Sequence, residues 1–465
     1  MKKILFLLCI LTAFSSAFAQ KTTKVALPKT YKYRVYLKDK KHNDYSVKKP
    51  QKFLSEKALQ RRKKFGIAVD EYDVPVTGKY LAQLRKLGVK ICHTSKWNNT
   101  AVVETANKDV VNDIEKLAFV DSTRLVYSSP DSIDVITERV MVESEAWKTM
   151  SNPYGVGKHQ AEMIGVNHLH DAGYKGQGIT IAVIDGGFHN ADIIPAMKKL
   201  RILGTRNFVN PERSVYMEGD HGLMVLSCIG TNEPYAMIGT APEASFYLLV
   251  SEDGASEFMV EEDNWCAAVE YADSLGCDIV TSSLGYHQFD DKKMTHKYYE
   301  LNGHTAVNSR SASLAASRGL IVINSAGNSG TSPWKKIGFP ADAENILAVG
   351  AVRADSLNTN FSSLGNTADG RIKPDVMAMG QACRLVHPDG TLGRANGTSF
   401  ACPIMCGGVA CLLQAFPNTR PEKILDAVRE SGNNASHPDN VFGYGIPDLE
   451  KARLSIKLDE VLSEF

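Results

Sequence analysis

From about residue 160 onward, short apolar runs alternate with segments of helical pattern, and this rhythm restricts the fold more than any other feature. The apolar runs cover residues 179–184, 245–250, 278–283, 320–324 and 346–351, and a helical segment covers residues 258–275. Short, fully apolar strands between helices are typical of a parallel sheet with helices on both faces. The sequence therefore predicts a three-layer α/β fold with a mostly parallel central sheet. In such sheets sites form at the carboxyl ends of strands, where we expect Asp185 and the loops at Gly285 and Asn328.

The N-terminal part has a different pattern. Residues 31–37, 100–105 and 122–127 resemble strands, whereas residues 54–64 and 109–117 resemble helices, the first with Ser55 as its cap. Residues 128–157 are rich in Ser, Pro, Asp and Gly, which indicates a linker. We therefore expect a small α+β domain with its linker at residues 20–150 and the larger domain at residues 151–465.

The charge of the chain is balanced overall but uneven along its length. The 53 Lys and Arg against 52 Asp and Glu argue against a dedicated nucleic-acid-binding protein. Residues 21–80, however, contain 17 Lys and Arg and only six Asp and Glu. A basic N-terminal domain and an acidic remainder would attract each other. A lysine-rich surface exposed to solvent would give the same excess.

The first twenty residues have the features of a secretory signal peptide. Lys2 and Lys3 precede an apolar run at residues 4–14, and Ala17-Phe18-Ala19 forms a small-x-small cleavage site. The sequence thus predicts a signal peptide at residues 1–19 and a secreted or periplasmic protein. No later run reaches about 18 uninterrupted apolar residues, so we expect no membrane span.

The cysteines do not resemble a disulfide framework, although Cys9 aside they number eight. Cys402, Cys406 and Cys411 fall in one apolar, small-residue stretch that predicts a buried helix, where cysteine serves as a small hydrophobe. A metal site there is disfavoured, because no His or acidic residue accompanies them.

Three motifs carry candidate chemistry. Asp185 ends a strand in IAVIDGG, His221 begins a helix in GDHGLMV, and Ser399 precedes the cysteine-rich helix in NGTSFACP. A serine nucleophile needs an imidazole base near its hydroxyl and a buried carboxylate that orients the imidazole. Asn328, just after a strand, could donate to an oxyanion together with the Ser399 N–H.

Taken singly, these signals are weak. Asp before Gly-Gly is usually a turn former, and Asn-Ser-Gly is ordinary turn chemistry. We assign His189, four residues after Asp185, to a loop. Gly173, Gly176 and Gly178 precede a strand rather than follow one, so they do not form a dinucleotide-binding fingerprint.

Taken together, the motifs resemble those of the subtilisin-like serine peptidases, the subtilases. The matching segments are VIDGG, DHG, SSLG at residues 282–285, AGNSG and GTSFACP, and the resemblance extends over about residues 155–450. It implies a subtilisin-like fold and a secreted serine endopeptidase with Asp185, His221 and Ser399 as catalytic residues and Asn328 in the oxyanion hole. Its substrates would be proteins or peptides. No cofactor is needed for catalysis; structural calcium is compatible with the family, but its ligands cannot be located from the sequence.

The resemblance also implies that residues 20–150 are a propeptide of ferredoxin-like shape. Such a propeptide acts as an inhibitor and chaperone of its own enzyme and is removed by self-processing, here between about residues 127 and 154. A retained accessory domain is the alternative.

Some positions depart from the family pattern. Gly186 replaces the Ser or Thr that usually follows the catalytic Asp, Leu223 replaces a Thr, and Phe400 replaces a Met. A catalytically silent binding or scaffold protein on the same fold is therefore an alternative. An esterase or lipase is disfavoured, because the G-x-S-x-G elbow is absent and the order of the triad differs.

The resemblance also suggests the main substrate pocket. Its two walls would be Ser283, Leu284 and Gly285 on one side and Ala326 and Gly327 on the other, with Gly338 at its floor. A glycine at the floor leaves space, which predicts cleavage after large apolar or aromatic residues. The alternative is that residues 329–336 cover the pocket and change its character.

Overall fold

A computed structural model describes residues 22–142 and 147–462 of the chain. Its largest element is a seven-stranded sheet of order β15-β14-β13-β12-β7-β11-β8, in which every neighbouring pair is parallel. The strands are β7 (Thr180–Asp185), β8 (Arg201–Asn207), β11 (Ser245–Val250), β12 (Ile279–Ser282), β13 (Ile321–Ser325), β14 (Leu347–Val352) and β15 (Val376–Met379). Every residue of β7, β12, β13 and β14 is buried, as the apolar runs predicted.

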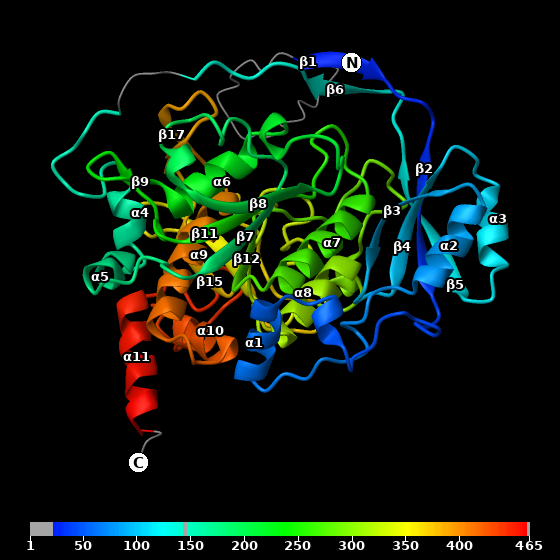
Figure 1. The fold of residues 1–465 in the computed structure, drawn as a ribbon. Helices are drawn as coiled ribbons and strands as arrows, with labels where there is room; N and C mark the ends of the chain where they lie inside the picture. Colours follow the sequence, from blue (N-terminus) through cyan, green and yellow to red (C-terminus); the bar gives the residue numbers. More distant parts are fainter. Residues whose placement is uncertain (1–21, 143–146, 463–465) are drawn as a thin grey trace, which may run out of the picture.

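Helices cover both faces of this sheet and complete the predicted three layers (Figure 1). Helices α6 (His221–Gly230) and α9 (Thr398–Ala415) pack on one face, and α7 (Val260–Leu275) and α8 (Val307–Ser317) pack on the other. Helix α9 has the length and apolar composition of a membrane span, but 89% of it is buried inside the fold. The predicted α/β fold class is confirmed.

The remaining elements of this domain surround the three layers. The helices are α4 (Lys158–Glu162), α5 (Val166–Asp171), α10 (Pro421–Glu430) and α11 (Leu449–Leu462) with the 3₁₀ turns η2 (Met197–Lys199), η3 (Val215–Met217) and η4 (Tyr298–Glu300). Two small antiparallel pairs are β9 (Asn232–Glu233) with β10 (Met237–Ile238) and β16 (Cys383–Val386) with β17 (Leu392–Ala395).

The N-terminal domain is an antiparallel sheet of order β3-β4-β2-β5 with helices on its outer face. Its elements are β2 (Tyr31–Leu37), α2 (Gly78–Lys86), β3 (Lys90–Ser95), β4 (Thr100–Thr105), α3 (Val110–Glu115) and β5 (Val120–Ser128). The predicted α+β character is confirmed, and β2 and β4 have the predicted bounds. The sequence reading missed α2 and β3, because β3 is polar and only its last residue is buried.

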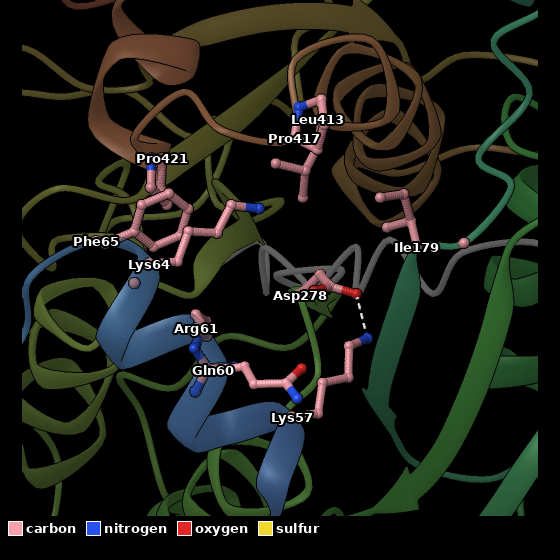
Figure 2. Close-up of a pocket in the computed structure, with 12 residues that line it drawn as sticks. Lys57, Gln60, Arg61, Lys64, Phe65, Ile179, Asp278, Leu413, Pro417 and Pro421 are labelled. Atoms are coloured by element: carbon pink, nitrogen blue, oxygen red, sulfur yellow. Dashed lines mark hydrogen bonds and ion pairs between the residues drawn. The ribbon is translucent and has the colours of Figure 1, made fainter.

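One helix of the N-terminal segment leaves its own domain. Helix α1 (Glu56–Lys64), which follows the 3₁₀ turn η1 (Pro50–Lys52), begins at the predicted cap, where Ser55 Oγ accepts the Ala58 N–H at 3.1 Å. The helix does not pack on its own sheet, however, but lies against the larger domain, where Lys57 Nζ bonds Asp278 Oδ2 at 2.6 Å (Figures 1 and 2).

Carboxylates of α7 join the two domains. Arg34 bonds Asp263 in a bidentate pair, at 2.6 and 2.8 Å. Asp273 accepts from Arg61, Arg62 and Lys96, and it is fully buried. The charge asymmetry of the sequence thus corresponds to an internal interface rather than to a solvated surface alone.

The linker is more ordered than its composition predicted. Within this segment, strand β6 (Ser132–Ile136) pairs antiparallel with β1 (Thr22–Ala26). Beyond β6, Arg139 forms a bidentate pair with Asp192 of the larger domain. The predicted signal peptide at residues 1–19 lies outside the described residues.

Candidate active site

A cleft of about 510 Å³ lies at the carboxyl ends of the central strands, where the fold class predicts a site. Its walls come from the ends of β7, β12 and β13, from the loop after β11 and from the first residues of α6 and α9. Asp185, His221, Asn328 and Ser399 all line it, so the fold brings together four predicted residues that are far apart in sequence.

Asp185 and His221 meet because β7 ends and α6 begins at the same place. Gly222 permits this approach, since a Cβ at that position would lie 2.4 Å from the Gly187 carbonyl oxygen and 2.9 Å from the Asp185 Cβ. His221 Nδ1 lies 2.8 Å from Asp185 Oδ1, which also accepts the Gly186 N–H at 2.7 Å. The second nitrogen of the imidazole, Nε2, is left for another partner.

The electrostatics of this pair favour a charged imidazole. Burial lowers the pKa of His221, but the charge of Asp185 and its hydrogen bond outweigh burial and raise the pKa to about 9. A buried carboxylate that raises the basicity of its histidine is the arrangement expected of a general base.

Ser399 lies in the first turn of α9 and is 7% exposed. Its Oγ donates to the Ser283 carbonyl at 3.3 Å, and Ser283 Oγ donates to the Ser399 carbonyl at 2.8 Å. The hydroxyl therefore donates to the residue that follows β12 rather than to the imidazole that the sequence analysis expected near it. Catalytic hydrogen bonds are often loose before substrate binds.

Asn328 is held in a defined orientation. Its Oδ1 accepts both the backbone N–H of Thr398 at 2.9 Å and the Thr398 hydroxyl at 3.0 Å. These two hydrogen bonds occupy Oδ1, so the amide group turns its Nδ2 donor away from Thr398. A donor fixed in this way, next to the N-terminus of α9, suits the stabilisation of negative charge.

The predicted substrate pocket is only partly as expected. Ser283, Leu284, Gly285, Gly327 and Gly338 line the cleft. Ala326 does not; it is fully buried in a separate apolar cluster with Ile337 and Phe339, because successive side chains of an extended segment point to opposite sides. A Cβ on Gly338 would lie 3.3 Å from the Gly285 backbone, so a larger residue at this position would press against the facing segment of the cleft.

The cleft also contains Glu252, which the sequence analysis missed. Glu252 lies two residues after the end of β11. Because sites form at the carboxyl ends of parallel strands, a search of the residues after every predicted strand would have found it. Burial, and then the charge of Asp185, raise the pKa of Glu252 to about 7.

The departure at Gly186 has a visible consequence. Asp185 Oδ2 is buried and has no hydrogen-bond partner among the described residues. Gly186, which stands where the family usually has Ser or Thr, brings no side-chain donor to this carboxylate and contributes only its backbone N–H, to Oδ1.

Two other features do not belong to the site. A cavity of about 250 Å³ between α1 and the larger domain is lined by Lys57, Arg61 and Lys64 and carries no nucleophile with an adjacent base (Figure 2). Within residues 22–142 and 147–462, no three His, Cys, Asp or Glu side chains gather as metal ligands. The eight described cysteines are free thiols.

Comparisons with known proteins agree with the fold. The sequence profile of the subtilase family matches residues 176–445, and that of the Bacteroidota propeptide domain of S8 peptidases matches residues 32–140. Subtilisin NAT of Bacillus subtilis subsp. natto is 28% identical over 367 residues, which cover 77% of this chain and 81% of the relative. Subtilisin of Bacillus pumilus is 29% identical over 301 residues, 63% of this chain and 95% of the relative.

Among solved structures, MycP1 with its N-terminal propeptide removed superimposes with a TM-score of 0.51 and 21% identity. The match covers 63% of this chain and 96% of that structure. At this identity the likeness concerns the fold alone.

Proposed function

Because this chain belongs to the subtilase family and is a serine endopeptidase with a propeptide domain, we propose that it cuts peptide bonds through an acyl-enzyme formed on Ser399. The observation that supports this most directly is the contact of 2.8 Å between His221 and Asp185 in the cleft that also contains Ser399. Family membership alone does not assign the reacting residues, and this geometry supports their assignment to Asp185, His221 and Ser399.

In the proposed mechanism, substrate binding turns the Ser399 hydroxyl from Ser283 toward His221 Nε2. His221 takes the hydroxyl proton while Oγ attacks the scissile carbonyl carbon, and Asp185 holds the proton on Nδ1 and stabilises the imidazolium. Asn328 Nδ2 and the Ser399 N–H donate to the oxyanion. His221 then gives its proton to the leaving amine, and water repeats the sequence to release the acyl group.

Hydrolysis of a peptide substrate tests this assignment. Ser399→Ala should lower kcat by about 10⁶-fold, the loss found for the nucleophile of a subtilisin, while the fold is retained. Asn328→Ala should cost about 10²- to 10³-fold. A folded Ser399→Ala protein with the turnover of the wild type would exclude Ser399 as the nucleophile, whereas a folded, processed wild type without any turnover would favour a silent scaffold.

We further propose that the protein is exported by its signal peptide and made as a self-processed zymogen. Residues 20–150 would act as the inhibitor and folding chaperone, and cleavage would fall between about residues 127 and 154. Intact mass should show loss of this segment from the wild type and its retention in Ser399→Ala. Equal masses for the two proteins would support a retained accessory domain.

The proposed chemistry needs no cofactor, so a chelator should leave the chemical step intact, and added calcium should at most slow thermal inactivation.

The proposed pocket favours large apolar or aromatic residues before the cut, because Gly338 has no side chain at its floor and Leu284 is uncharged. Trp334 stacks on His287 with ring centroids 5.0 Å apart, and His287 lines the cleft, so residues 329–336 border the pocket.

A further inference from the structure

The charged side chains that line the cleft are mostly acidic. Its lining includes the carboxylates of Asp185, Asp220 and Glu252, and none of its described lining residues is Lys or Arg. Asp185 is engaged by His221 and by the Gly186 N–H. Glu252 is the carboxylate of this set that lies between the catalytic pair and the proposed substrate pocket.

Two contacts fix the place of Glu252. Its Cβ lies 3.8 Å from the point where a Cβ on Gly186 would stand, which puts it beside Asp185. Its Oε2 accepts from the Tyr286 hydroxyl at 3.5 Å, and Tyr286 directly follows the pocket wall at Gly285. Glu252 thus spans the rim from the catalytic pair to the wall on which the acyl side of the substrate would lie.

The carboxylate has unused hydrogen-bonding capacity. An ionised carboxylate has about four acceptor sites, and the long bond from Tyr286 occupies one. Glu252 forms no ion pair with any residue that the structure describes, and it is half-buried rather than fully solvated. A carboxylate in this state gains more from a cation than one exposed to solvent.

Substrate geometry decides which residue would meet it. A substrate bound as an extended strand points successive side chains to opposite sides. When one side chain enters the pocket floored by Gly338, the side chain before it lies on the other side of the strand, beside His221 and Glu252. Building on the proposed endopeptidase function, we propose that Glu252 selects Lys or Arg at the residue immediately before the pocket-filling one.

The electrostatics of the site support this assignment. Burial and the charge of Asp185 hold the pKa of Glu252 near 7, with further contributions from His221, Tyr286 and Asp253. An approaching ammonium or guanidinium group favours the ionised form and so strengthens its own binding. A substrate carboxylate at the same place would face Glu252 and Asp185 together and be rejected.

Matched peptides test the proposal on the processed enzyme. Three substrates share one pocket-filling residue, Phe, and differ only in the residue before it: Lys, its uncharged isostere norleucine, or Glu. We expect kcat/KM to be about tenfold higher for Lys than for norleucine, the size of a partly solvated charge-assisted contact, and lowest for Glu. In Glu252→Gln the ratio of Lys to norleucine should fall to about one. Glu257→Gln removes a neighbouring carboxylate that does not line the cleft and should keep the wild-type ratio.

Three results would overturn the proposal: an unchanged ratio in Glu252→Gln, a wild-type ratio near one, or a preference for Glu over Lys. If Glu252→Gln fails to fold, Glu252→Asp serves instead, because it keeps the charge on a shorter side chain and should preserve a reduced ratio. Failure of the proposed endopeptidase function would give a different result. Neither the wild type nor any variant would then cleave any of the three peptides, and both proposals would be wrong.

Discussion

At the residue scale, the pair of Asp185 and His221 controls when the site can react. The imidazole must be neutral to accept the Ser399 proton, yet its surroundings favour the charged form. Two further carboxylates, Asp220 and Glu252, stand near the same ring and act in the same direction. These negative charges raise the pKa of His221, and that pKa sets the pH dependence of the reaction.

The first prediction concerns that pH dependence. Because the pKa of His221 is raised to about 9, the imidazolium persists above the ordinary histidine value of about 6.5, and activity should be lost as pH falls through the raised pKa. We expect the acid limb of kcat/KM, which reports the free enzyme, to have its midpoint well above 6.5. A midpoint at or below 6 would contradict the described electrostatics.

The second prediction uses the unpartnered oxygen of Asp185. A Cβ on Gly186 would contact only the Glu252 Cβ, at 3.8 Å, so Gly186→Ser fits without strain. A serine hydroxyl that donates to Oδ2 would weaken the pull of Asp185 on the imidazolium and move the acid limb to lower pH. Gly186→Ala adds the same Cβ without the hydroxyl and is the matched control. Identical pH profiles for the two variants would show that the hydroxyl does not reach Asp185.

At the element scale, the site depends on how closely β7, α6, α9 and β12 approach one another. The contact of α6 with the end of β7 relies on Gly222, which has the Gly187 backbone where its side chain would be. Elements packed to this density transmit small changes directly to the distance between Asp185 and His221.

The third prediction tests this contact. Gly222→Ala forces a Cβ to within 2.4 Å of the Gly187 oxygen, so the unfolding free energy should fall by about 1–3 kcal/mol and kcat should fall with it. Gly254→Ala, in the loop after β11 of the same domain, is the control, because no heavy atom lies within 4 Å of its Cβ position. Chemical denaturation and peptide hydrolysis measure both effects. Equal behaviour of the two variants would mean that the close approach does not position His221.

The burial of each element explains which strands could be predicted from the sequence and which could not. Fully apolar strands such as β11 and β14 were located nearly to the residue, because burial on both faces leaves a continuous apolar run. The polar strand β3 and the edge strand β8 were missed, since alternation is weak where one side meets water or another domain. Motif spacing located the residues of the cleft, but not the orientation of the Ser399 hydroxyl or of Ala326, which depends on tertiary packing.

At the scale of the whole molecule, the N-terminal domain is bound through buried ion pairs as well as an apolar contact. Its sheet packs on α7, and α1 reaches further along the larger domain than the sheet does (Figure 1). Asp273 is central to this interface, since three cations of the N-terminal domain converge on it. Burial raises the pKa of Asp273, but Lys96, Arg62 and Arg61 outweigh it and lower the pKa to about 2.

The fourth prediction follows for association of the separated domains. Asp273→Asn removes the carboxylate on which three buried cations converge, although Arg62 keeps its pair with Asp73, and it should weaken inhibition by the added N-terminal domain by about 3–5 kcal/mol, with peptide hydrolysis itself retained. The control Asp113→Asn breaks an exposed pair and should change inhibition little. Because the pKa of Asp273 is lowered, its contribution is complete above about pH 4 and is lost as pH falls toward 2. Dissociation constants of the two domains, measured from pH 6 to pH 2 by a binding assay that needs no peptide hydrolysis, should show this loss, and equal effects of both variants would contradict it.

The central claim is that Ser399 is a nucleophile activated by His221, and covalent labelling tests it most directly. The processed enzyme is treated with a fluorophosphonate probe, and the modified residue is located by peptide mass. The account predicts one adduct, on Ser399, that is absent from Ser399→Ala and forms far more slowly in His221→Ala, both variants being freed of residues 20–150 by an added protease before labelling. A folded, processed protein that takes up no label, or one labelled at a different residue in both wild type and Ser399→Ala, would contradict it.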